Sequence, residues 1–121
     1  MSYDIQLHRK ETKDKHKHYI GEDFFENEEN LVHFSTSQKQ ELFNRLIRYG
    51  YFVESENAKE TTFGFKSDAS IRALLTEAGL YFSASGEDGV FEMCMTASEF
   101  TDTNEFLEYD PQNGGWEEPM Q

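Results

Sequence analysis

The chain has 121 residues, with 24 Asp and Glu against 11 Lys and Arg and a formal net charge of −13. At this length folding removes roughly two-thirds of the unfolded chain's surface from water, so we predict one domain over residues 1–121 with a substantial core. The negative charge disfavours nucleic acid and anionic membranes as partners, because both are bound through clustered Lys and Arg.

The N-terminal half predicts a strand, a helix and a hairpin. Residues 3–8 alternate apolar and polar side chains, which is typical of a half-buried strand. Residues 9–34 are predicted to be a charged, partly mobile connection. A helix is expected over 37–49, where Ser37 and Gln40 form a capping box and Gly50 ends the helix in the left-handed conformation. "YFVESE" and "TTFGFK" flank the polar "NAKE", which predicts an antiparallel hairpin.

The next segment predicts the same order of elements again, a helix followed by a hairpin. In "SDASIRALLTEAG", residues 67–79, the apolar positions follow the spacing of one helical stripe, so we predict a second helix that ends at Gly79. "LYFSAS" and "VFEMCMTA" flank the turn "GEDG" and are interpreted as a second hairpin. One face of its last strand would carry Phe91, Met93, Met95 and Ala97.

These elements give the order βαββαββ and an α+β class. The first six match a ferredoxin-like arrangement, in which two helices lie on one face of an antiparallel sheet, and the seventh adds an edge strand. Leu46 and Leu74 should then be buried beneath the sheet. Residues 98–121 form an acidic, aromatic C-terminal extension that we expect to dock on the domain.

The histidines of "HKH" raise the possibility of a metal site. His16 and His18 could chelate a divalent ion together with Glu22 or Asp23. The neighbouring lysines repel a cation, however, and no further ligand has a defined spacing. We therefore favour incidental surface histidines and predict no metal site.

Two other candidate sites are also disfavoured. Cys94, His8 and Asp4 could meet on one sheet face as a nucleophile with its base, but spacing supplies neither the contact nor an oxyanion donor. The series Asp102, Asn104, Glu108 lacks the central glycine of a calcium-binding loop. We predict no catalytic residue and no cofactor.

Charge is unevenly placed along the chain. Residues 67–121 carry twelve carboxylates against one cation, Arg72. This charge can simply maintain solubility, or it can steer a basic protein partner toward aromatic anchors. On the second interpretation the partner-binding residues are predicted to be Glu105, Glu108, Tyr109, Trp116, Glu117 and Glu118. The oligomeric state is left open.

Cysteine usage and hydropathy indicate a compartment. The single cysteine, Cys94, cannot form an intrachain disulfide, which points to a reducing environment. The first ten residues contain no apolar signal segment, and no window approaches the roughly 18 apolar residues of a membrane span. The sequence therefore predicts a cytoplasmic protein.

The stretches "MSYDIQL" and "YDPQNGGW" resemble the first strand and a terminal turn of small, mostly uncharacterised bacterial proteins that begin MSYDI or MSYDL. Some small acidic bacterial proteins of this appearance are immunity proteins, which bind and neutralise a toxin. The resemblance implies a non-enzymatic, acidic protein-binding module, immunity-like in its specific role, and carries over no functional residue. The alternative is a small-molecule-binding or enzymatic domain that uses the polar sheet face around His8 and Cys94.

Overall fold

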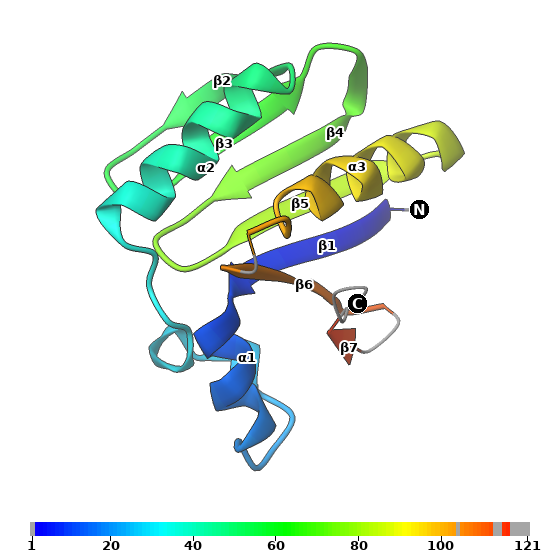
Figure 1. Cartoon of the computed structure of the whole chain (residues 1–121). Coiled ribbons are helices and arrows are strands. Elements are labelled where there is room, and N and C mark those ends of the chain that lie inside the picture. The colour runs from blue at the N-terminus through cyan, green and yellow to red at the C-terminus, as the bar shows by residue number, and fades with distance from the viewer. Residues whose placement is uncertain (1, 104, 113–114, 117–121) are drawn as a thin grey trace.

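The computed structural model describes residues 2–103, 105–112 and 115–116. Its strands form one antiparallel sheet in the spatial order β2-β3-β4-β5-β1-β6-β7, and helices α2 and α3 lie on one face of that sheet (Figure 1). The elements in chain order are β1 (Ser2–Arg9), α1 (Lys10–Lys17), the short 3-10 helices η1 (Phe24–Glu26) and η2 (Glu28–Asn30), α2 (Thr36–Arg48), β2 (Tyr51–Glu56), β3 (Thr61–Phe65), β4 (Asp68–Leu75), β5 (Leu80–Ser85), α3 (Glu87–Glu99), β6 (Phe106–Asp110) and β7 (Gly115–Trp116).

The α+β class and the antiparallel sheet are confirmed, whereas the ferredoxin-like βαββαββ order is not. In chain order, α2 is followed by the four strands β2 to β5, which form a meander, and then by α3. The described residues also contain a third α-helix, α1. Strand β1 then inserts between β5 and β6, so the two ends of the chain are joined in the sheet.

Helix α2 and the hairpin that follows it agree with the sequence pattern. The predicted capping box is present two residues earlier than expected: Ser35 Oγ accepts from the Gln38 N–H at 3.0 Å, and Gln38 Oε1 accepts from the Ser35 N–H at 2.9 Å. Gly50 has a φ of 99°, the left-handed conformation expected at the end of this helix. Strands β2 and β3 pair on either side of the predicted turn.

Residues 68–75 form a strand, so the predicted second helix is wrong. Ile71, Ala73 and Leu75 are buried in alternation with more exposed neighbours, which is the period of a strand. Asp68 does not cap a helix, because its Oδ1 accepts from the N–H and the Oγ–H of Ser70 at the start of β4. Pairing with β3 and β5 satisfies the backbone on both sides, and this tertiary gain overrides the helical preference of Ala and Leu.

Residues 87–99 form helix α3, so the predicted strand from "VFEMCMTA" and its "GEDG" turn are also wrong. Glu87 and Asp88 occupy the first helical turn, where the positive end of the helix dipole favours carboxylates. The buried positions are Gly89, Met93, Thr96 and Ala97, which lie on one side of a helix. Gly89 permits close packing, since a Cβ there would lie 2.8 Å from Ser70 Oγ.

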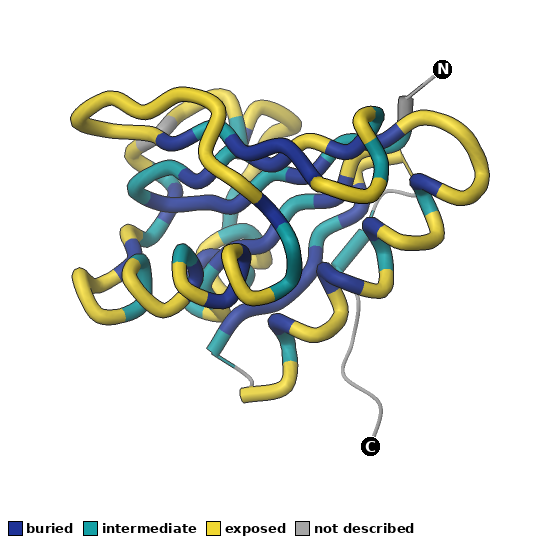
Figure 2. The backbone as a smooth tube through the Cα atoms, turned by 90° about the horizontal axis from the view of Figure 1, so that it is seen from above, coloured by how far each residue is buried: buried dark blue, intermediate teal, exposed yellow. Residues whose placement is uncertain are grey.

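The main core lies between the sheet and the pair α2 and α3. Buried positions run through the central strands, while the outer turns of the helices and the loops are exposed (Figure 2). Leu46 is 0% exposed, as predicted. Leu74 is not beneath the helices, because it follows buried Ala73 on the opposite face of the sheet and remains partly exposed.

The segment 9–34 is more structured than the connection predicted for it. It contains α1, η1 and η2, and it buries Thr12, Phe24 and Leu31. Thr12 Oγ1 accepts from the Val32 N–H at 2.9 Å, which ties α1 to the end of the segment. Phe24 and Leu31 form a second, smaller core with Ala78.

Candidate functional site

The outer face of α3 combines exposed apolar side chains with carboxylates. Phe91 and Met95, four residues apart and therefore on one helical face, are 67% and 53% exposed. A hollow of about 420 Å³ beside them is lined by Phe91, Cys94, Met95, Ser98, Glu99 and Asp102. The other exposed carboxylates of this helix are Glu87, Asp88 and Glu92, and α3 contains no Lys or Arg. This arrangement is an acidic helix face with an apolar centre.

Arg45 of α2 fixes the C-terminal end of α3. This buried guanidinium donates to Asp102 Oδ1 at 3.1 Å and to the Glu99 carbonyl oxygen at 2.8 Å, and its Cζ lies 4.8 Å from the centre of the Phe100 ring. Burial alone would lower the pKa of Arg45, but hydrogen bonds with Tyr49 and Asp102 reverse that effect and raise it. The outer face of α3 is thus presented by a helix that is held at its C-terminal end.

Two of the carboxylates predicted to meet a partner, Glu105 and Glu108, lie outside α3 and are partly or wholly enclosed. Glu105 is half-buried, and its Oε1 accepts from Gln38 Nε2 at 3.2 Å. Glu108 is 5% exposed, and Ser98 Oγ donates to it at 3.1 Å. Glu117 and Glu118 lie outside the described residues.

The two predicted aromatic anchors pack into a ring cluster near α1. Tyr109 and Trp116 are both half-buried, with ring centres 5.1 Å apart. Phe25 lies 4.5 Å from the Tyr109 ring, and the Trp116 Nε1–H donates to His16 Nδ1 at 2.9 Å. Much of their surface is therefore already engaged within the chain.

His8 and Cys94, which the alternative interpretation places on one sheet face, are separated by the sheet. His8 is 0% exposed on the face opposite α2 and α3, near Phe25, Tyr81 and Trp116. Cys94 belongs to α3 and packs against the main core. A nucleophile and base formed by these two residues is not present.

The histidines of "HKH" also lie apart. His16 stacks on Phe24 with ring centres 4.6 Å apart, whereas His18 is exposed at the end of α1. Burial lowers the pKa of His16. Within the described part of the chain, no three His, Cys, Asp or Glu side chains are grouped in a way that could hold a metal ion.

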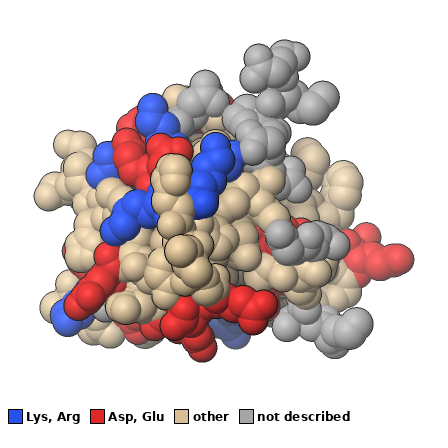
Figure 3. All heavy atoms as spheres, turned by 90° about the horizontal axis from the view of Figure 1, so that it is seen from below, with Lys and Arg blue, Asp and Glu red and all other residues tan. Residues whose placement is uncertain are grey.

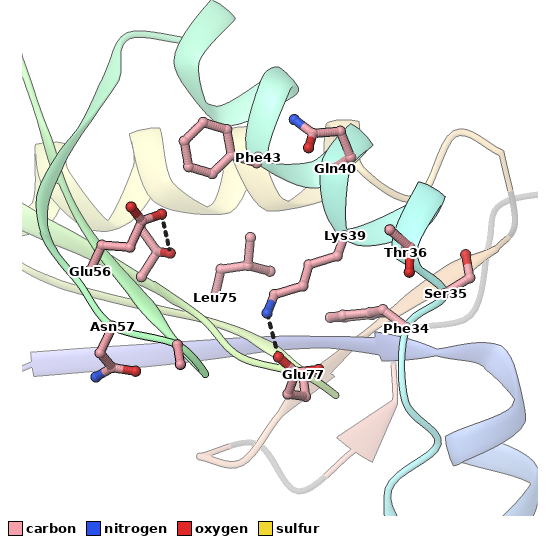
Figure 4. A pocket seen from close by; sticks show the side chains of 12 residues that line it. Phe34, Ser35, Thr36, Lys39, Gln40, Phe43, Glu56, Asn57, Leu75 and Glu77 are labelled. Carbon is pink, nitrogen blue, oxygen red and sulfur yellow. Dashed lines mark hydrogen bonds and ion pairs between the residues drawn. The ribbon is translucent and has the colours of Figure 1, made fainter.

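A pocket of about 460 Å³ lies between the start of α2 and the β2–β3 turn (Figure 4). Lys39 extends across it, and its Nζ donates to Glu77 Oε1 at 2.6 Å. This contact lowers the pKa of Glu77. Glu56 Oε2 accepts from Thr61 Oγ1 at 3.3 Å. Lys39 is thus already paired, and Glu56 adds a second carboxylate to the lining. The Lys39–Glu77 ion pair joins α2 to the β4–β5 connection.

The sheet face opposite α2 and α3 carries a second hollow, of about 570 Å³. Register places Asp4, Ser83, Arg72 and Gly64 in one row across four strands. Arg72 Nη1 forms an ion pair with Glu54 of β2, across the intervening strand β3. The lining of this hollow includes both signs of charge, from Asp4 and Arg72, and the phenol of Tyr81.

Surface charge at the α1 end is mixed. Figure 3, which views this end, shows Lys and Arg side chains standing among Asp and Glu side chains, with further carboxylates along the lower edge of the view. In α1 itself the lysines alternate with Glu11 and Asp14. Among the described residues, none of the helices has the length and apolar character required to cross a membrane.

Comparison of the chain with protein-family models, curated proteins and solved structures found no match.

The sequence pattern did not lead us to predict the acidic face of α3, although the residues that indicate it were present. Glu87 and Asp88 directly follow Gly86, as expected for the first turn of a helix, and Phe91 and Met95 then have helical spacing.

Proposed function

We propose that this protein is a non-enzymatic binding module that captures a basic protein partner on the outer face of α3, in an immunity-like role. The observation that carries the proposal is the pair Phe91 and Met95, exposed at the centre of a helix face that bears carboxylates and no cation. Exposed apolar side chains within a polar rim are typical of protein-binding sites.

The two kinds of side chain have different roles in this proposal. Carboxylates steer an oppositely charged partner over several ångströms and so act on the association rate. Phe91 and Met95 supply short-range contacts, which act mainly on dissociation. The hollow between Phe91 and Ser98 offers room for an apolar side chain of the partner, so a basic surface with one protruding apolar residue fits this face best.

Capture with matched baits tests the proposal. The wild-type chain should recover a basic protein from the lysate of its source organism, and Phe91→Ser/Met95→Ser should lose it. The control is Phe52→Ser/Val53→Ser, because both side chains are 40% exposed on edge strand β2, away from α3. Recovery that survives the α3 change, or a recovered protein that is acidic, contradicts the proposal.

Binding kinetics then separate steering from contact. Neutralising Glu87→Gln/Asp88→Asn/Glu92→Gln/Glu99→Gln should slow association about tenfold at low salt, whereas Phe91→Ala should speed dissociation about 30-fold. A control removes the same amount of charge from exposed carboxylates outside α3: Glu22→Gln/Glu26→Gln/Glu29→Gln/Glu60→Gln. An equal loss of association rate in both quadruple variants would assign the effect to net charge and not to this face.

A small-molecule-binding function is the second candidate, and the hollow on the open sheet face supports it. The lining residues there include Asp4, Arg72 and Tyr81 but not Cys94. A metabolite screen by ligand-observed NMR, repeated with Arg72→Ala, distinguishes this candidate, since α3 variants should leave any such binding unchanged.

A further inference from the structure

We propose that His16 and Trp116 form a pH-sensitive latch, which holds strand β7 against α1 near neutral pH and releases it in acid. Trp116 Nε1–H donates to His16 Nδ1 at 2.9 Å, across 100 residues of sequence. Since the indole N–H can only donate, His16 Nδ1 must carry a free electron pair. Protonation of the imidazole places a second donor against the indole, and the hydrogen bond is lost.

Strand β7 depends strongly on this contact. It lies at one edge of the sheet and spans only Gly115–Trp116, pairing with Asp110 and Tyr109 of β6. Isolated pairs of such short strands have little stability of their own. The remaining described attachment is the packing of the Trp116 ring against Tyr109, Phe25 and the two histidines. A charge placed inside this ring cluster therefore acts where β7 is held.

The neighbours of His16 favour its neutral form. His16 faces Phe24 and Phe25 of η1, Tyr109 of β6 and Trp116 of β7. Stacking on Phe24 would favour a cation, but burial has the larger effect, and the pKa of His16 is lowered.

The second histidine, His8, makes the cluster less tolerant of charge. His8 is wholly buried, and its described neighbours are Phe25, Tyr81 and Trp116. Its Nδ1 lies 3.3 Å from the Ala78 carbonyl oxygen and its Nε2 lies 2.9 Å from the Gln6 amide. Coulombic repulsion from His16 adds to burial in lowering the pKa of His8. Among the described residues, the ring contacts of the pair bring two further titratable groups against it, the phenols of Tyr81 and Tyr109.

The direction of the pH effect follows from these shifts. An imidazole whose pKa is lower in the closed state than in the open state stabilises the closed state above pH 6.5, and that stabilisation is lost as the pH falls. Opening would expose the free edge of β6 and the Tyr109 ring, so the acidic form would present a surface that the neutral form covers.

Trp116 is the single tryptophan of the chain, so its fluorescence reports directly on the latch. Between pH 8 and pH 4 we expect a red shift of emission and an increase in acrylamide quenching, at a higher pH than any change in far-UV circular dichroism. In His16→Phe, which keeps a ring but cannot titrate, this early transition should be absent. The control His18→Phe alters an exposed histidine two residues away and should retain it.

A measurement on the wild-type chain keeps the proposal testable if His16→Phe folds poorly. The protection of the Trp116 indole N–H against hydrogen exchange, relative to a free indole at the same pH, should fall by up to about tenfold for each pH unit as the pH drops from 6.5 toward the midpoint of the His16 titration. Indole protection that is constant across this titration, or a Trp116 transition that coincides with global unfolding in every variant, would overturn the latch.

Discussion

Leu75→Ala is expected to lower the free energy of unfolding by about 2–5 kcal/mol, and Leu74→Ala by about 1 kcal/mol or less. The two leucines are adjacent in β4, but Leu75 is 1% exposed within the main core, whereas Leu74 lies on the open face of the sheet. Truncation at Leu75 leaves a cavity among close-packed side chains. At Leu74 water can occupy the vacated space. Urea unfolding followed by circular dichroism measures both values.

The pair also distinguishes the two structures that the sequence allows for residues 67–79. In the predicted helix, Leu74 and Leu75 belong to one buried stripe and would cost similar amounts. In β4 they point to opposite faces, so their costs should differ severalfold. Similar losses for the two variants would therefore contradict the strand. Leu46→Ala, in a helix on which pattern and structure agree, supplies the reference for a buried leucine.

Local patterns were sufficient where they admitted one interpretation. β1 has strict alternation, α2 has a capping box and a terminal glycine, and β2 and β3 flank a polar turn. They failed at β4, where Ile71, Leu74, Leu75 and Ala78 fit a helix while Ile71, Ala73 and Leu75 fit a strand. Both sets are present in the same residues. Pairing with β3 and β5 decides between them, and the hydrophobic pattern within residues 67–79 does not encode that pairing.

A similar ambiguity between helix and strand, in residues 87–99, led us to predict the candidate site in a different part of the surface. Composition placed the acidic, aromatic character correctly in residues 67–121, but its position on the surface depended on whether residues 87–99 are a helix. As a strand, Phe91 and Met95 would have been buried with Met93. As a helix, the segment turns them outward. Tyr109 and Trp116, by contrast, are less exposed than expected, because β6 pairs with β1 and brings their rings against η1 and α1. No local pattern encodes this long-range pairing.

Acid should destabilise the folded chain through His8, by about 3 kcal/mol between pH 7 and pH 4. Burial is the largest cause of a pKa lowered from 6.5 to about 4, and each pKa unit corresponds to about 1.4 kcal/mol. The unfolded chain then binds the proton more readily than the folded chain throughout this window. Stability is therefore full above pH 6.5 and is lost as the pH falls toward 4.

The comparison that isolates His8 uses His16→Phe as the background, because the latch cannot titrate there. In that background the free energy of unfolding is measured by urea at several pH values with and without His8→Gln, which keeps an amide donor but has no proton to gain. The stability advantage of His8 over Gln should shrink by about 3 kcal/mol from pH 7 to pH 4. His18→Gln, at an exposed position at the end of α1, should leave the pH profile unchanged.

If the double variant is too unstable to measure, the imidazole C–H resonances of the wild-type chain report the pKa of His8 in the folded state directly. A His8 that titrates near 6.5 in the folded chain would show that water reaches the ring, and the buried position of His8 beneath Phe25 and Trp116 would then be wrong.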